Sequence, residues 1–307
     1  MNSLPLGGIF EFAVGFLYVN HATKLDSPRS GDSTNRRFDL EKIEGKLHIM
    51  QSMLSDGGYN LVFNMLSLGI AAMLFTTIFL VMGRERVLPR YRMAVMVSAT
   101  VTGIAAYHYF RMFDSFNHAF GPDAIEGSVY NVGYRYVDWF LTVPLLLVET
   151  VAVLGLARAL QSSMLARLVP AAALMIGLGY PGDAQLNLLY EGDAPLWGAL
   201  STIPFLYILY VLFVELGKSL DRQSAAVQRK VKELRLLLLA TWGVYPISFI
   251  FNMNATGFDE GGFVLRETGY TIADILAKCL FGLVIFTIAR IKSAEDDKEF
   301  AAKEFRD

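Results

Sequence analysis

A small group of ionisable residues lies within stretches of sequence that are otherwise apolar. The group comprises His108, Arg135, Asp138, Glu149, Asp274 and Lys278. Charge is costly in an apolar medium, so such residues usually belong to ion or proton pathways or to ligand sites. Asp138 and Glu149 are eleven residues apart, which on a helix gives nearly the same face, about 16 Å apart along the axis. Two carboxyl groups in this arrangement could be two stations for a proton.

Lys278 could carry a covalent ligand. A lysine removed from water favours its neutral amine, which is the nucleophile that forms a Schiff base with a carbonyl compound. Asp274 precedes it by four residues and would lie on the same helical face. Trp139, Trp242 and Tyr245 could enclose a long apolar ligand, although aromatic residues at helical spacing are more often part of a core.

Each of these ionisable residues also has a simpler structural interpretation. Asp274 and Lys278 could form a structural ion pair, and Glu149 could be a polar group satisfied between helices. His108 could be a core histidine that donates to a carbonyl, and Arg135 could extend outward to the membrane surface. Several costly groups at a similar depth are harder to explain by structure alone, which favours the functional interpretation.

Long apolar windows must position these residues. Of the 307 residues, 54% are hydrophobic, and the mean hydropathy is +0.41, which is too apolar for an ordinary soluble domain. A helix that crosses a bilayer needs about 20 mostly apolar residues. The candidate windows are 60–83, 93–110, 130–156, 161–180, 194–214, 236–253 and 269–289. Because a backbone in lipid must satisfy its own hydrogen bonds, the sequence predicts an all-α membrane protein with a seven-transmembrane-helix bundle.

Basic residues in the loops predict the orientation of this bundle. Twelve of them follow the first, third and fifth windows: Arg84, Arg86, Arg90, Arg92, Arg158, Arg167, Lys218, Arg222, Arg229, Lys230, Lys232 and Arg235. The alternate loops carry only Arg111 and Arg266. The positive-inside rule therefore places the N-terminus outside and the C-terminus in the cytoplasm, in a multi-pass protein of the cell (inner) membrane. A net charge of −2 gives no reason to expect a nucleic-acid partner.

The chain divides into three predicted regions. Residues 1–56 are an N-terminal extracellular extension, in which the spacing of apolar residues between 40 and 54 predicts an amphipathic helix. Its first twenty residues are apolar and could be a surface segment or a signal peptide. Residues 57–291 form the seven-helix domain, and residues 292–307 form a charged cytoplasmic tail.

Four motifs resemble those of microbial rhodopsins. They are "RYVDWFLTVPLLLVE" (135–149), "YTIADILAK" (270–278), "WGVYP" (242–246) and "GIAAYHYF" (103–110). The stretches "LMIGLGYPGD" (174–183) and "WGALSTIPFLYILYVLFVEL" (197–216) look most like the xanthorhodopsin and Gloeobacter rhodopsin pumps of the proteorhodopsin group. The family usually has Glu where this chain has Asp183, a change to which no mechanism is attached.

The resemblance implies all-trans retinal bound to Lys278 as a protonated Schiff base. Asp138 would be its counterion and proton acceptor, and Asp274 a second counterion. Glu149 would be the proton donor from the cytoplasmic side, consistent with its apolar surroundings, which favour the neutral carboxyl form. Together with Thr142, Asp138 and Glu149 form the Asp-Thr-Glu triplet of eubacterial proton pumps.

The resemblance also assigns the residues around the chromophore. Arg135 would organise the counterions from outside, and His108 would form a hydrogen bond with Asp138 and tune its proton affinity. The retinal would be lined by Trp139, Leu146, Trp242, Tyr245 and Pro246. Leu146 implies green rather than blue absorption. Gly198 would open a slot for a carotenoid antenna, or else be a packing glycine between helices.

The function implied is light-driven outward proton pumping. A sensory photoreceptor that signals through a partner is the main alternative, and Glu149 argues against it. Sodium and chloride pumps of the family carry other residues at the triplet positions. Neither an appended catalytic domain nor a metal or nucleophile motif is evident, so an enzyme is not expected. The expected partners are membrane lipids, protons and further copies of the chain, as a pentamer or trimer.

Overall fold

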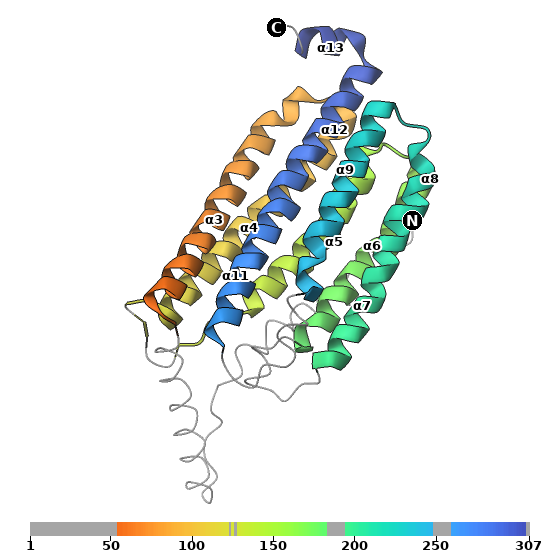
Figure 1. Cartoon of the computed structure of the whole chain (residues 1–307). Helices are drawn as coiled ribbons and strands as arrows, with labels where there is room; N and C mark the ends of the chain where they lie inside the picture. Colours follow the sequence, from red (N-terminus) through yellow and green to blue (C-terminus); the bar gives the residue numbers. More distant parts are fainter. Residues whose placement is uncertain (1–53, 123, 126–127, 183–193, 248–258, 305–307) are drawn as a thin grey trace, which may run out of the picture. The chain divides into compact units, whose positions relative to one another are not determined.

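A computed structural model describes residues 54–122, 124–125, 128–182, 194–247 and 259–304. Within these ranges the chain is built of helices joined by short turns, as the all-α prediction requires (Figure 1). The predicted extension at 1–56, with its amphipathic helix, lies almost wholly outside the described residues, and so does Asp183.

The main helices are α3 (Asp56–Gly83), α4 (Pro89–Phe120), α5 (Gly133–Val153), α6 (Arg158–Gly179), α7 (Ala194–Tyr210), α9 (Ala225–Trp242), α11 (Glu260–Asp274) and α12 (Phe281–Asp296). Shorter elements are η1 (Arg84–Arg86), η2 (Tyr180–Gly182), η3 (Val211–Glu215), α8 (Leu216–Leu220), η4 (Ile275–Leu280) and α13 (Lys298–Glu304). The π-helical turns η3 and η4 join α7 to α8 and α11 to α12 without a break in the helix.

Local sequence explains where several helices begin. The side-chain oxygens of Ser55, Ser224 and Asp259 accept hydrogen bonds from the first turns of α3, α9 and α11, at 3.1, 3.3 and 2.9 Å. Such caps satisfy backbone N–H groups that have no partner within the helix. Pro89 stands at the first position of α4, where its missing N–H costs nothing.

The described helices agree with the apolar windows of the sequence. Six of them are long and apolar enough to cross a membrane: Asp56–Arg86, Pro89–Phe120, Gly133–Val153, Arg158–Gly182, Pro195–Leu220 and Glu260–Asp296. The window predicted at 236–253 corresponds to α9, which begins eleven residues earlier, at Ala225. The early part of α9 is rich in charged residues, so hydropathy alone did not reveal it.

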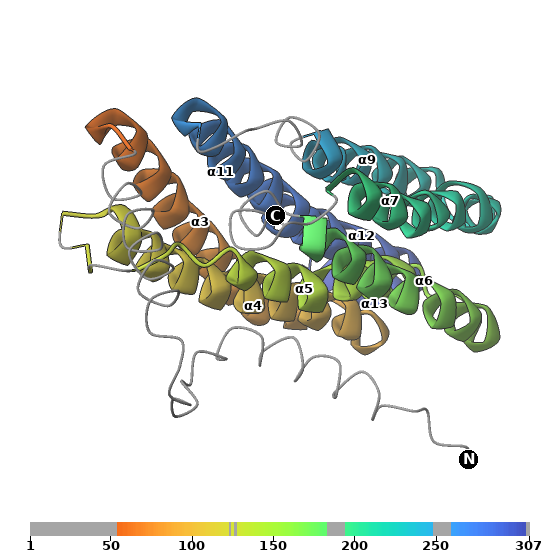
Figure 2. The same cartoon turned by 90° about the horizontal axis from the view of Figure 1, so that it is seen from below.

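The helices run side by side in alternating directions (Figure 1; Figure 2 shows the view from below). Helices α3, α4, α5, α6 and α7 pack in chain order, each against the next one. The continuous series α11, η4 and α12 packs against α3, α4 and α9. The turns at 84–88, 154–157 and 221–224 therefore gather at one end of the bundle, here called the basic end. The other end is called the opposite end.

Two backbone features shape the centre of the bundle. Gly69 of α3 lies directly against the ring of Tyr109, and a side chain at this position would overlap that ring. The close approach brings the Tyr109 hydroxyl to the middle of the bundle, where it donates to Asp274. The turn η4 carries Lys278 as the last helix changes from α to π geometry and back. Such π-turns are frequent at functional sites.

Candidate functional site

The centre of the site is a buried lysine between two buried carboxylates. Lys278 Nζ lies 2.8 Å from Oδ2 of Asp138 on α5 and 2.9 Å from Oδ1 of Asp274 at the end of α11. Lys278 is 2% exposed, and both aspartates are fully buried. A buried charge is tolerated when it is paired, so this triad holds its charges through mutual attraction. The pairing of Asp274 with Lys278 expected from their spacing is thus observed.

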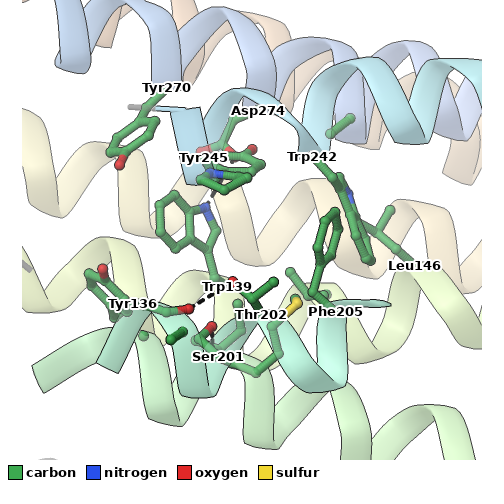
Figure 3. Close-up of a pocket in the computed structure, with 18 of the residues that line it drawn as sticks. Tyr136, Trp139, Leu146, Ser201, Thr202, Phe205, Trp242, Tyr245, Tyr270 and Asp274 are labelled. Carbon is green, nitrogen blue, oxygen red and sulfur yellow. Dashed lines mark hydrogen bonds between the residues drawn. The ribbon is translucent and has the colours of Figure 1, made fainter. Parts of the chain in front are cut away.

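The two carboxylates have very different surroundings. Oδ1 of Asp274 accepts hydrogen bonds from Trp139 Nε1 (3.1 Å) and from the Tyr245 hydroxyl (2.5 Å), and Oδ2 accepts one from the Tyr109 hydroxyl (2.8 Å). Figure 3 shows Trp139 and Tyr245 converging on Asp274. Within the part of the chain that the structure describes, Asp138 Oδ2 has only the lysine as partner, and its Oδ1 is buried without one. Asp138 is therefore the carboxylate with an oxygen left to receive a proton.

Arg135 lies on the side of Asp274 that faces the opposite end. Its Nη1 is 3.6 Å from Asp274 Oδ2, and its Nη2 is 2.6 Å from Oε2 of Glu267. The Tyr130 hydroxyl donates to the same Glu267 oxygen at 2.9 Å, and Nη2 of Arg266 is 3.2 Å from Oε1. Arg135 thus bridges the central triad and a second buried carboxylate.

Sequence reasoning missed Glu267 and counted Arg266 as a loop residue. Both are buried in the first turns of α11, which begins nine residues before the predicted window. A signal was present, because Glu267 precedes Asp274 by seven residues, or two helical turns on the same face. Charged residues lower the hydropathy around Glu267, so the apolar window begins only after it, at residue 269.

His108 is buried on α4, but it does not form the hydrogen bond expected with Asp138 in this structure. Its Nδ1 is buried without a partner, as is Oδ1 of Asp138. The imidazole ring instead meets the ring of Tyr107 edge-on, with centroids 5.1 Å apart. The structural alternative, a histidine that donates to a carbonyl, is not observed for Nδ1 either. A role of His108 in tuning Asp138 stays a prediction.

The remaining triplet residues lie on the buried face of α5, as the spacing predicts. The hydroxyl of Thr142 donates to the backbone carbonyl of Asp138 at 2.8 Å, which fixes the threonine one turn from the acid. Glu149 is fully buried, and by geometry neither of its carboxyl oxygens has a hydrogen-bond partner among the described residues, although the buried Ser98 hydroxyl of α4 lies nearby. It stands about 16 Å from Asp138 along the helix, toward the basic end. The structure therefore keeps Glu149 apart from the central triad.

An apolar cavity of about 420 Å³ adjoins the lysine. Its lining includes every residue predicted to line the retinal, Trp139, Leu146, Trp242, Tyr245 and Pro246, and also Gly198, which was predicted to open the carotenoid slot. It also includes residues that the sequence did not reveal, such as Tyr136, Met175, Phe205 and Tyr270. Figure 3 shows Tyr136 and Phe205 turned toward the same space as the predicted aromatics. Tyr136 could have been found, because it precedes Trp139 by one helical turn.

The cavity fits the retinal that the sequence motifs imply. Lys278 and Asp274 belong to its lining, so a lysine nitrogen and a carboxylate border an otherwise apolar and aromatic space. Its volume lies within the range usual for sites that bury a small organic molecule. An elongated apolar aldehyde would form a Schiff base with the lysine nitrogen and pack against the apolar and aromatic lining of the cavity.

The chain matches a known family over most of its length. Residues 60–292 match the family model described as bacteriorhodopsin-like protein. The chain is 32% identical over 225 residues to the green-light absorbing proteorhodopsin of Gamma-proteobacterium EBAC31A08, covering 71% of this chain and 82% of that protein. It is 31% identical over 223 residues to bacteriorhodopsin of Halobacterium salinarum, covering 72% of this chain and 80% of that protein.

Solved structures extend this likeness to three dimensions. The crystallographic structure of xanthorhodopsin, described as a light-driven ion pump with dual chromophore, aligns with a TM-score of 0.72 at 47% identity. This alignment covers 79% of this chain and 97% of that one. The crystal structure of thermophilic rhodopsin aligns with a TM-score of 0.73 at 44% identity, covering 79% of this chain and 98% of that one.

Proposed function

The chain belongs to the bacteriorhodopsin-like proteins, the microbial rhodopsins, and on that premise we propose that it is a light-driven outward proton pump. It is a multi-pass membrane protein with the seven-helix fold of that family. It is related to light-driven ion pumps, and the family implies a retinal chromophore rather than an enzymatic reaction. The proton as cargo, its direction and the residue roles below are the proposal.

The observation that carries the proposal is the arrangement of three buried carboxyl groups. Asp274 is saturated by donors, Asp138 has one oxygen without a partner, and Glu149 has none at either oxygen. A carboxylate that accepts several hydrogen bonds is stabilised in its charged form, and an isolated buried one is not. Asp274 is therefore suited to keep its charge, and the other two carboxyls are suited to exchange protons.

The first proton transfer runs from Lys278 to Asp138. Retinal, when bound to Lys278, supplies light absorption and a change of shape that alters the proton affinity and direction of the attached nitrogen. The N–H bond at Nζ then breaks, and an O–H bond forms at Asp138, whose Oδ2 already lies 2.8 Å from Nζ. Asp274 stays charged beside them and holds the site through Trp139, Tyr245 and Tyr109.

The second transfer restores the proton on Lys278 from Glu149. Its apolar burial favours the neutral carboxyl, so Glu149 holds a proton in the resting protein. The separation of about 16 Å along α5 exceeds a direct hydrogen bond, so this step requires water to enter between the two groups. On the other side, Asp138 passes its proton toward the opposite end past Arg135 and Glu267. One proton then moves from the basic end to the opposite end in each cycle.

The proposed orientation makes this transport outward. The twelve basic residues of the loops after the first, third and fifth windows place the basic end in the cytoplasm, with the N-terminus outside. We further propose a carotenoid antenna beside Gly198, a wall residue of the retinal cavity. The xanthorhodopsin that aligns with this chain is described as having a dual chromophore, which supports that proposal.

A pH measurement on illuminated cells tests the function. Cells that express the protein with added retinal are suspended in unbuffered medium and illuminated with green light. We expect acidification of the medium that a protonophore abolishes, and no response from a Lys278→Ala variant. Alkalinisation of the medium that the protonophore enhances would indicate transport of another ion, because protons then enter the cell passively. A coloured wild-type pigment without any pH change would overturn the pump and favour a sensory photoreceptor.

A further inference from the structure

A second buried lysine lies at the basic end of the bundle. Lys292 of α12 is 9% exposed, and its Nζ donates to Oε1 of Gln223 at 2.6 Å. The same Nζ lies 5.5 Å from the centre of the Tyr91 ring. Among the described residues, no carboxylate lies within ion-pair distance of Lys292. A buried ammonium held by a neutral amide and an aromatic ring is bound more loosely than one in a buried ion pair.

Gln223 connects this lysine to the end of α5. It lies in the turn between α8 and α9, and its Nε2 donates to the backbone carbonyl of Leu154 at 3.3 Å. The next residue, Gly155, has a φ of +60°, which a side chain would disfavour. A Cβ added at Gly155 would lie 3.6 Å from the Tyr91 ring and 3.9 Å from Cε of Lys292, so the end of α5 packs close to both side chains. One lysine thus joins α12 to the α8–α9 turn and, through Gln223, to the end of α5.

This link stands directly beyond Glu149 on the way to the basic end. Leu154 follows Glu149 by five residues, about 7.5 Å along the helix. The residue between them that continues the buried face, Val153, is completely buried. Other completely buried apolar residues near this end are Val227, Val231 and Ile288. A proton that arrives from the basic end therefore meets completely buried apolar residues beside the Lys292–Gln223 link.

We propose that Lys292 and Gln223 form a gate that must separate before Glu149 can be reprotonated from the aqueous phase. The proposal rests on the proposed function, in which Glu149 gives up its proton in each cycle. The gate acts in two ways. Its hydrogen bonds hold the α8–α9 turn on the end of α5, and its positive charge repels an incoming proton. Lys292 is a positioning residue here, because it never touches Lys278 or Asp138.

Two substitutions that should accelerate proton uptake and one that should slow it test the gate. Lys292→Met keeps the length of the side chain and removes the charge and the donor, so proton uptake after a flash should accelerate, by about tenfold if one such bond limits opening. Gln223→Leu should accelerate it in the same direction. Gln223→Glu replaces the amide by a carboxylate that pairs with Lys292, and uptake should slow. Uptake is followed with a pH-indicator dye on purified pigment in nanodiscs.

The controls separate the gate from a general loss of structure. The absorption maximum and the rate at which Lys278 loses its proton should stay unchanged in all three variants. Lys230→Met, at an exposed lysine that pairs with Glu233, should leave uptake unchanged. Equal rates in wild type and variants, or a change of the same sign in Gln223→Leu and Gln223→Glu, would overturn the gate. A wild-type pigment that shows no proton uptake at all would overturn the proposed function instead.

Discussion

The two halves of the bundle on either side of Lys278 are built on different principles. Toward the opposite end, buried Arg135 has Glu267 and Asp274 as partners, and Tyr130 and Tyr109 donate to these carboxylates. Toward the basic end, Glu149 is buried, and no described residue forms a geometric hydrogen bond with either of its oxygens. The first half contains a connected polar network in the resting state, and the second contains an isolated acid in apolar surroundings.

This difference indicates how each half handles a proton. Charged groups that pair with one another keep their charges when buried, so Arg135 and Glu267 form a polar path beside Asp274 that is already present in the resting structure. An isolated buried carboxyl is tolerated mainly in its neutral form, so Glu149 stores a proton until water reaches it. Under the proposed function, release therefore uses contacts that already exist, whereas reprotonation requires the basic end to open. Directional transport follows when the two halves respond at different times.

Asp138→Asn should have the largest effect on transport. The amide cannot take up the proton of Lys278, so light-driven acidification should be abolished. The absorption maximum should move to longer wavelength because a negative charge beside the cation is lost. Both are measured on pigment and on cells. Asp114→Asn, at a half-exposed aspartate near His118, is the matched control and should transport normally. Unchanged transport in Asp138→Asn would remove its role as acceptor.

Glu149→Gln should have the next largest effect on transport, and it acts on the half toward the basic end. The resting structure should hardly change, because an amide is neutral like the stored carboxyl. Reprotonation of Lys278 should slow by about 10²- to 10⁴-fold, the usual contribution of a positioned acid. Added azide, a small acid that can enter the protein, should restore much of the rate. Flash absorption spectroscopy measures it, and Glu233→Gln serves as control at an exposed glutamate. A wild-type rate without azide would refute the donor role.

Glu267→Gln should affect stability more than transport. Arg135 and Arg266 would lose their shared carboxylate while remaining buried, and breaking a buried pair in this way costs about 3–5 kcal/mol. The midpoint of thermal bleaching should fall clearly, whereas Glu149→Gln should leave it nearly unchanged. Glu299→Gln, at an exposed glutamate of α13, should have little effect. Equal midpoints for the variants at 149 and 267 would contradict the contrast between the two halves.

The sequence revealed the charged residues that stand alone in apolar windows better than the paired charges near the start of α11. Asp138, Glu149 and Lys278 stand alone in apolar windows, so each was visible as an exception to its surroundings. Arg266 and Glu267 stand next to each other at a helix start, where paired charges resemble a loop. Their burial depends on α11 packing against α3, and no local pattern encodes that contact.

Side-chain partners were also beyond the sequence. The motif predicted a lysine with two acids, and the structure adds that Asp274 has several donors while Asp138 has one. That inequality depends on Tyr109 reaching across from α4, which Gly69 on α3 permits. The hydrogen bond predicted between His108 and Asp138 is not formed in this structure. A histidine on the correct helix must also have its ring oriented by its neighbours.

Gly198→Trp should have the smallest effect on the pump, because Gly198 belongs to neither half of the proton path. It lies in the wall of the retinal cavity, and its backbone carbonyl already accepts a hydrogen bond from Thr202 at 2.7 Å. A large side chain there would fill the proposed antenna slot and leave Lys278, Asp138 and Glu149 untouched. With a carotenoid supplied, excitation of the carotenoid should drive pumping in wild type and not in the variant, while green light drives both. Equal carotenoid-driven pumping in the two proteins would place the antenna elsewhere or exclude it.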